Sequence, residues 1–325
     1  MSRILLILGL VLLMTVPVSV AQAGSSYDGS GTAVISDGSS LSDRISYSMT
    51  GVTRLDASQA YEGWLVNSSS GAQVSTGVMK MTGLGDISHS WVSPDGANLL
   101  DGYDTVMVSV EAVPDADASS PSGTTAFTST VAAGTLSTVR GLVASDGALT
   151  GLRSSLDSAI ASATSARSAA SLADLKTHTE SAIASINGDS GAIAHAASAQ
   201  TTLGDGSASV SASITNASGW ATEAHDGALE VLNQDSLVIA QALLTNVSGS
   251  LDAARNGMTS NDKGGAEQAY SGAQALATYN YGGAAGVVLT PSVGDTTIPM
   301  MAQMALALAF MLITSGGLLY ARSKR

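Results

Sequence analysis

Hydrophobic and polar positions alternate in short runs over residues 25–136, and Gly, Asp, Asn and Ser separate the runs. In the run 44–52, Ile45, Tyr47 and Met49 fall on one face, while arginine, serine and threonine fall on the other. Alternation with period two, broken by turn residues at intervals of about 8–12, is typical of an all-β sandwich. The expected strands are 32–36, 44–52, 60–66, 76–81, 87–92, 105–113 and 126–131.

From residue 140 onwards alanine dominates, and hydrophobic residues recur at steps of three and four. This period indicates amphipathic helices that pack against partners. Shorter stripes begin at Leu149 and Leu172, and the clearest stripe is Leu237, Ala240, Leu244, Val247, Leu251, Ala254 and Met258. Asn187-Gly188 and Asn256-Gly257 are expected helix stops, and Asp235-Ser236 is an expected N-cap. We expect four to six helices in an antiparallel bundle within residues 140–281.

The first 23 residues have the pattern of a secretory signal peptide. Arg3 precedes an apolar run over residues 4–14, and Ala21-Gln22-Ala23 supplies small residues at the cleavage position. The run is short for a full membrane span, although an uncleaved N-terminal anchor is the alternative. We therefore expect residues 1–23 to be removed and the mature chain to begin at Gly24.

A second apolar run lies near the C-terminus. Residues 300–321 carry no charge, and 22 residues in a helix are long enough to cross a hydrocarbon core of about 30 Å. Arg322, Lys324 and Arg325 follow, and basic residues beside a span stay on the cytoplasmic side. The expected segments are a flexible stalk at 282–297, a transmembrane helix at 298–321 and a basic cytoplasmic tail at 322–325. This type I topology places the bulk of the chain outside the cell membrane.

The amino-acid composition argues against several classes of binding partner and attachment. The formal charge of the chain is -13, and without Arg3 and the three basic residues of the tail the exported part keeps 9 Lys and Arg against 26 Asp and Glu. Binding to nucleic acid needs basic clusters that displace counterions, so the sequence argues against it. The chain has no cysteine, so it has neither disulfides nor a lipoprotein anchor. Stability must come from hydrophobic burial, with helices packed through small side chains.

Residues 61–81 are expected to form a hairpin around a Ser/Gly-rich turn. We expect Trp64 and Leu65 on the first strand to make a buried contact with Val78 and Met79 on the second strand. Aromatic side chains bury much area per residue. The aromatic residues expected to carry much of the core are Tyr61, Trp64, Trp91 and Tyr103. An exposed aromatic platform for a ligand is the alternative.

Four short motifs follow one another in this half: Tyr-x-x-Trp-Leu, Thr-Gly-Val, Val-Glu-x-x-Pro and Pro-Ser-Gly. Their residues are Tyr61, Trp64, Leu65, Thr76, Gly77, Val78, Val110, Glu111, Pro114, Pro121, Ser122 and Gly123. In order and spacing, residues 28–136 resemble the extracytoplasmic domain of anti-sigma-K factors of the RskA type. The resemblance implies an RskA-like β-sandwich domain at 24–136 and a connection to sigma-factor regulation.

The arrangement also departs from that family. A working anti-sigma factor needs a cytoplasmic segment that grips sigma, whereas here a signal peptide precedes the domain and four residues follow the span. The chain is more similar to exported bacterial surface proteins in which such a domain precedes a helical one, here an Ala-rich domain at 137–281. Helical modules of that kind carry a His-x-x-His pair, of which this sequence keeps His178 and has Ser181 at the second position.

The C-terminal segment resembles bacterial sorting signals of the IPTL or PEP-CTERM type. Ile298-Pro299 precedes one hydrophobic span and a short basic end, as in those signals. The resemblance implies that a membrane protease cuts near this pair and releases or transfers the protein. A permanent single-span anchor is the alternative.

The sequence carries no pattern that indicates catalysis. It lacks a Gly-x-Ser-x-Gly elbow, a P-loop and a dinucleotide fingerprint, and the Gly-Asp-Gly at 204–206 is too short for a calcium loop. His178, His195 and His225 lie on different expected segments, and only their meeting in the bundle would give a metal site. We therefore expect no enzyme activity, no cofactor, and no catalytic, cofactor-binding or metal-ligating residue.

The leading hypothesis is a non-enzymatic, membrane-anchored cell-surface protein with a structural or binding role at the envelope. Its expected partners are the membrane and an envelope protein or polysaccharide. The alternative is an extracytoplasmic component of sigma-factor signalling that acts through a membrane partner. A metal or electron carrier is a third, more distant hypothesis.

Overall fold

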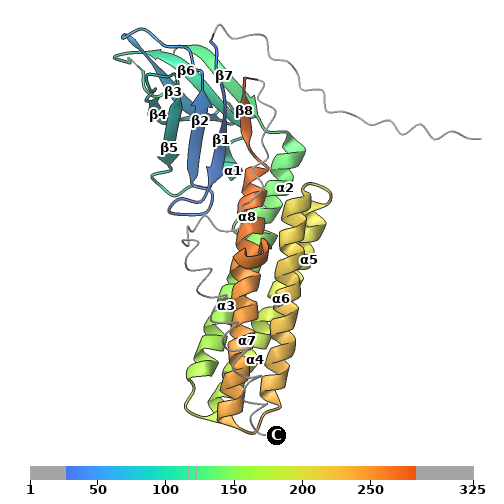
Figure 1. The fold of residues 1–325 in the computed structure, drawn as a ribbon. Coiled ribbons are helices and arrows are strands. Elements are labelled where there is room, and N and C mark those ends of the chain that lie inside the picture. Colours follow the sequence, from blue (N-terminus) through green and yellow to red (C-terminus); the bar gives the residue numbers. More distant parts are fainter. Residues whose placement is uncertain (1–26, 116, 122, 283–325) are drawn as a thin grey trace, which may run out of the picture.

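The computed structural model describes residues 27–115, 117–121 and 123–282, and it shows a β-sandwich joined end-on to an elongated bundle of helices (Figure 1). Each layer of the sandwich is a four-stranded antiparallel sheet. In spatial order, the first sheet contains β5 (Ile87–Val92), β2 (Arg44–Thr50), β1 (Ser30–Ser36) and β8 (Tyr279–Tyr281). The second contains β4 (Gln73–Met79), β3 (Gln59–Val66), β6 (Thr105–Ala112) and β7 (Thr124–Thr130).

The mixed α and β architecture expected from the sequence is confirmed, and each of the seven expected strands overlaps an observed one. The alternation in β2 works as predicted, because Ile45, Tyr47 and Met49 are all buried between the sheets. A short helix, α1 (Leu99–Gly102), connects β5 to β6.

The sandwich core is tightly packed around Gly63 on β3. A Cβ atom at Gly63 would lie 2.4 Å from Oγ1 of Thr76 and 2.5 Å from Cε of Met79, so only glycine fits there without movement of the neighbours. The phenol of Tyr47 reaches across from the other sheet, and its hydroxyl lies 3.0 Å from Oγ1 of Thr76. Burial of this ring raises the pKa of Tyr47 far above its ordinary value.

The hairpin at residues 61–81 differs in one respect from the prediction. Leu65 and Met79 are buried in the sandwich core, but Val78 is 55% exposed and Trp64 projects from the opposite face of β3. The register shifts at a bulge between Gly63 and Trp64, where β4 has one extra residue opposite β3. The expected return of Val78 to a buried contact is therefore wrong.

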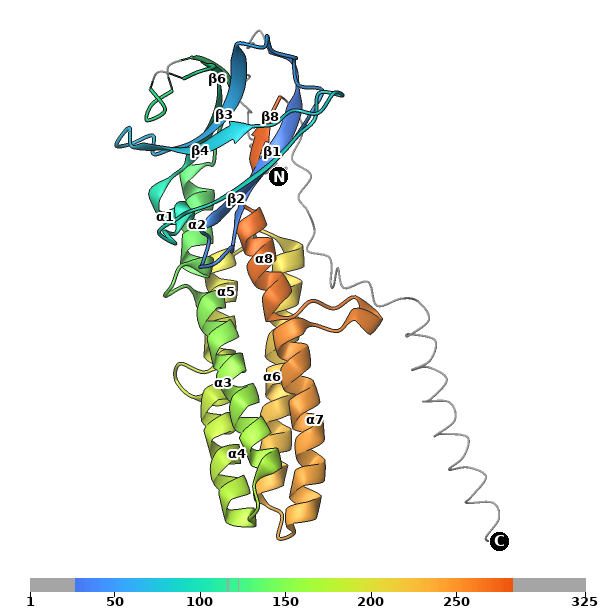
Figure 2. The same ribbon diagram turned by 90° about the vertical axis from the view of Figure 1, so that its left-hand side faces the viewer.

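Six helices form the elongated bundle below the sandwich, and α2 (Ala133–Val143) leads into it (Figure 2). They are α3 (Ala148–Ser168), α4 (Leu172–Asn187), α5 (Ala192–Leu203), α6 (Ala208–Leu232), α7 (Leu237–Asn256) and α8 (Ala266–Ala275), with a short 3-10 helix η1 (Thr259–Asn261) before α8. Alanines fill much of the buried stripe of α3, α5 and α6, for example Ala217, Ala221 and Ala224 on α6. Small side chains let the helices approach closely, as composition predicted.

The helix stops are also confirmed, since α4 ends at Asn187 and α7 ends at Asn256. Met258, however, lies beyond α7 and is not part of its buried stripe. Ser236 is the N-cap residue of α7, but its side chain accepts no capping hydrogen bond.

The boundaries of the predicted helical domain, 137–281, need correction at both ends. The first helix already begins at Ala133. Residues 279–281 form β8, which pairs with Gly31, Thr32 and Ala33 of β1 and completes the first sheet. The helices are thus inserted between two strands of the sandwich. Three residues are too few to produce a visible period, which is why the pattern did not reveal β8.

This insertion brings the two ends of the described chain together. Gly31 pairs with Tyr281 at the end of the sandwich away from the helices, whereas Ser36 at the other end of β1 leads to the helices. Residues 27 and 282 therefore lie at the same pole of the molecule.

Several predicted segments lie outside the described residues: the signal peptide at 1–23, nearly all of the stalk at 282–297, the span at 298–321 and the tail at 322–325. Within the described residues, α7 is the one helix that is long and apolar enough to cross a membrane. Its buried residues, including Leu244 and Leu251, face neighbouring helices, whereas Val238 and Ile239 near its start are exposed.

Three helical glycines give a test of this packing. Gly219 on α6 and Gly249 on α7 have no atom near the position of an added Cβ, whereas a Cβ at Gly151 on α3 would lie 2.3 Å from Cε1 of His195. We expect Gly219→Ala and Gly249→Ala each to raise the free energy of unfolding by about 0.5–1 kcal/mol. Gly151→Ala is expected to lower it, because the ring of His195 on α5 must move. Urea denaturation followed by circular dichroism measures all three, and a stabilised Gly151→Ala would contradict the packing of α3 on α5.

Candidate functional site

The most highly connected polar group of the described structure lies where β1 meets the helices. Asp37 directly follows β1, and its Oδ1 accepts hydrogen bonds from the amide of Ser42 (2.9 Å), Nε2 of Gln274 (2.7 Å) and the hydroxyl of Tyr270 (3.1 Å). Gln274 and Tyr270 are buried residues of α8. One carboxylate therefore joins a loop of the sandwich to the helix that leads back into it.

A chain of ion pairs continues from Asp37 into the bundle. Arg153 on α3 lies 3.5 Å from Oδ2 of Asp37 and 3.1 Å from Oε2 of Glu267, and its guanidinium stacks 4.1 Å from the ring centroid of Tyr270. Arg255 on α7 contacts the same Glu267 oxygen at 2.6 Å and Asp157 at 2.8 Å. We call these five charged residues, Asp37, Arg153, Glu267, Arg255 and Asp157, the junction ladder. It connects the sandwich with α3, α7 and α8.

Burial and the nearby carboxylate of Asp37 raise the pKa of Tyr270 well above its ordinary value. The phenol therefore stays protonated and remains a hydrogen-bond donor at physiological pH. Its role in the junction is positional, because the hydroxyl donates to Asp37 and the ring supports Arg153.

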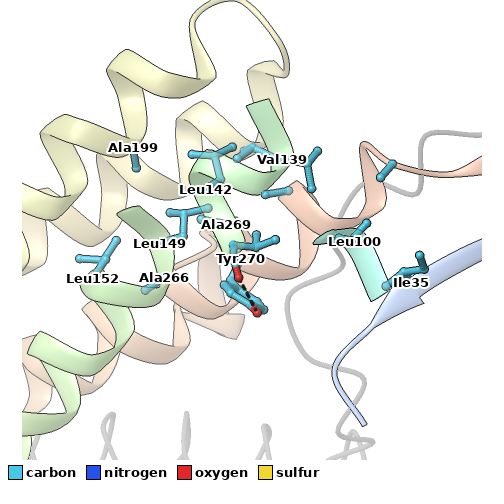
Figure 3. Packing of buried hydrophobic residues seen from close by; sticks show 14 of the residues in the cluster. Ile35, Leu100, Val139, Leu142, Leu149, Leu152, Ala199, Ala266, Ala269 and Tyr270 are labelled. Carbon is cyan, nitrogen blue, oxygen red and sulfur yellow. Dashed lines mark hydrogen bonds between the residues drawn. The ribbon is translucent and has the colours of Figure 1, made fainter. Parts of the chain in front are cut away.

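An apolar layer surrounds the ladder. Figure 3 shows Tyr270 beside Leu142 and Leu149 of the helices, with Leu100 and Ile35 on the sandwich side. All of these residues belong to one continuous hydrophobic cluster that runs from the sandwich into the bundle. At its edge, Nε of Arg140 donates to the carbonyl of Leu100 at 2.7 Å.

A groove of about 430 Å³ opens beside the ladder. Its lining residues are Leu41, Thr150, Arg153, Ser154, Asp157, Ser158 and Ala161. The two charges in the lining already have partners of opposite sign in the ladder, so the groove presents hydroxyl groups and compensated charges. The described lining has no histidine, so the groove offers no pairing of a nucleophile with a histidine base.

A second polar cluster lies on the outer face of the sheet that contains β3. The side chain of Trp64 is fully buried there, and its Nε1 donates to Oγ of Ser109 at 2.8 Å. Glu62, also buried, accepts a hydrogen bond from the hydroxyl of Ser75. Burial, reinforced by the charges of Asp115 and Glu111, raises the pKa of Glu62 above its ordinary value.

The histidines singled out in the sequence are not brought together. His178 is exposed on α4, His195 packs against Gly151 of α3, and His225 on α6 lies 3.3 Å from Nδ2 of Asn187. Within the described residues, no group of three or more histidine and carboxylate side chains is placed to hold a metal ion.

The aromatic residues of the hairpin do not form an exposed platform. Tyr61 and Trp64 are both buried, and Tyr61 lies 6.3 Å from Phe127 between ring centroids within the core. Sequence reasoning missed the junction instead. Asp37 and Tyr270 are 233 positions apart, and the only local signal at Asp37 is that of a turn after a strand.

Comparisons with protein-family models, with curated proteins and with solved structures found no match to this chain.

The junction ladder predicts that substitutions at its two ends lower the free energy of unfolding by different amounts. We expect Asp37→Ala to lower the free energy of unfolding by about 2–4 kcal/mol, because Gln274 and Tyr270 lose their acceptor while they stay buried. Asp157→Ala removes the carboxylate at the other end, whose side chain is 57% exposed, and we expect less than about 1 kcal/mol. Chemical denaturation of both variants checks the order, and equal losses would contradict the central place of Asp37.

Glu62 predicts an unusual dependence of stability on pH. Because its folded-state pKa is raised above the ordinary value of 4.5, its contribution to stability is present below pH 4.5 and is lost as the pH rises through the folded value. Glu62→Gln removes this loss, so we expect the variant to melt above the wild-type protein at pH 7 and level with it near pH 4. Glu230→Gln, the same substitution on the exposed face of α6, is the control variant measured beside it.

Proposed function

We propose that this chain is a non-enzymatic cell-surface protein, anchored in the membrane by residues 298–321, with a structural or binding role at the envelope. The observation that carries the proposal is the position of the chain ends. Residue 282 leaves the sandwich at the pole opposite the helices, so an anchor that follows it attaches at that pole. The sandwich then stands next to the membrane, and the bundle extends away from it.

The junction between the sandwich and the bundle supports a role in which the far end of the bundle is presented to a binding partner. The ladder and the continuous apolar cluster hold the helices in a fixed direction relative to the sandwich. A bundle held in this way projects α4, the ends of α3 and α6, and the start of α7 farthest from the anchored pole (Figure 1). Binding to another envelope component at that end needs no catalytic group.

The likeness to the RskA-type domain belongs to the same proposal. Tyr61, Trp64 and Leu65 lie on β3, while Val110 and Glu111 lie on the adjacent strand β6. In this proposal these residues build a sandwich of that kind, and the attached helices give it a task different from direct sigma inhibition.

The membrane anchor is tested by two matched double variants of the full chain. Leu306→Arg with Phe310→Arg places two charges in the predicted span, and each costs about 2.5–3.5 kcal/mol of insertion free energy at a span centre. Val238→Arg with Ile239→Arg places the same charges on exposed positions of α7. We expect the first variant to leave the membrane fraction of cells and the second to stay in it after an alkaline wash.

The opposite result would show that α7 holds the protein in the membrane, and release of neither variant would contradict a single anchor at 298–321. The intact mass of the wild-type protein from cells adds a separate measurement. A mass that ends at Arg325 identifies a permanent anchor, and a mass that ends near Ile298 identifies a processed sorting signal.

A further inference from the structure

The strand β8 has fewer paired residues than any other strand of the described structure. It has three residues and pairs with one neighbour, β1, through Gly31, Thr32 and Ala33. On its other side, the amide of Asn280 donates to Oγ of Ser129 on β7 at 2.9 Å, without a regular ladder. A short connection, residues 276–278, joins it to α8.

All three residues of β8 carry a buried polar atom that has no hydrogen-bond partner among the described residues. These atoms are the hydroxyls of Tyr279 and Tyr281 and Oδ1 of Asn280. Both tyrosines are almost completely buried, and Tyr281 meets Phe127 edge-on at 6.0 Å between ring centroids. A buried polar atom without a partner favours the state in which water can reach it. In β8 that state is the detached strand.

Detachment of β8 leaves a specific acceptor on the sandwich. The edge of β1 loses its neighbour over Gly31, Thr32 and Ala33, and two aromatic cavities open beside this edge at the spacing of alternate residues. Edge strands with free backbone groups readily add a strand from another chain. The full sequence contains one Tyr-x-Tyr segment, which is β8 itself. A second copy of this chain is therefore the partner that matches both the register and the cavities.

We propose that β8 is an exchangeable strand, which leaves its own β1 edge and inserts into the vacant edge of a second copy. Exchange of an identical element between copies needs no contact beyond those already present in the single chain. The inference rests on the described residues and does not depend on the membrane anchor.

Trapping between two single-cysteine copies tests the proposal, because the native chain has no cysteine. Full-length Thr32→Cys and full-length Asn280→Cys, which occupy paired positions of β1 and β8, are purified in detergent, mixed and oxidised. We expect a disulfide-linked heterodimer whose cross-link joins positions 32 and 280 in peptide mass spectrometry. The same two substitutions in one chain provide the control for native pairing, because their thiols form a disulfide within that chain.

The matched control is Ser46→Cys mixed with Ser90→Cys. Ser46 and Ser90 are also paired across two antiparallel strands, β2 and β5, and their hydroxyls lie 3.2 Å apart. Neither strand is terminal, so we expect no heterodimer above the background of random collision. Strand exchange is ruled out if Thr32→Cys and Asn280→Cys form no more heterodimer than Ser46→Cys and Ser90→Cys do, while the doubly substituted single chain forms its internal disulfide.

The unpartnered hydroxyls give a second, kinetic test. With Tyr279→Phe and Tyr281→Phe added to both mixed copies, the closed strand loses its two buried hydroxyls and opens less often. We expect heterodimer formation to slow by about tenfold or more. An unchanged rate would overturn the role given to these hydroxyls in the release of β8.

Discussion

The carboxylate of Asp37 fixes the relation between the sheet and the helices. It follows β1 directly, and it is the shared acceptor for Tyr270 and Gln274 of α8 and an ion-pair partner of Arg153 on α3. Tyr270 and Gln274 are buried, so loss of this acceptor would leave two buried donors without their partner. Asp37 thus joins the end of β1 to both α3 and α8, the helix that leads into β8.

The sandwich and the helices share more than this polar contact. The chain leaves the sandwich once, through α2, and returns once, from α8 into β8. One hydrophobic cluster extends across both crossings, so the sandwich and the bundle share apolar contacts at the junction. Loss of the junction exposes apolar surface on both sides, which couples their unfolding. A division of the sequence into two successive domains, one of strands and one of helices, therefore follows composition but leaves out β8, which belongs to the sandwich.

Local pattern was sufficient for most elements and insufficient for the contacts between them. The period-two runs predicted seven strands, and the Asn-Gly pairs predicted the ends of α4 and α7, because these signals lie within a few residues of the structure they specify. Trp64 was correctly predicted to be buried, but both faces of β3 are buried, so alternation could not tell a core face from a solvent face. Asp37 was missed because its partners on α8 lie more than 230 positions away.

The small strand β8 combines two opposing properties. In a chain with only 4% aromatic residues, it places two of the eight tyrosines in the core, so a large share of aromatic burial depends on three residues. Apolar burial of the rings holds the strand in place, while both hydroxyls lack a partner among the described residues and favour release. A phenylalanine at either position would bury the same ring without that penalty. The choice of tyrosine thus lowers the stability of the closed strand while it preserves the shape of the acceptor, and that combination is what reversible exchange between identical copies requires.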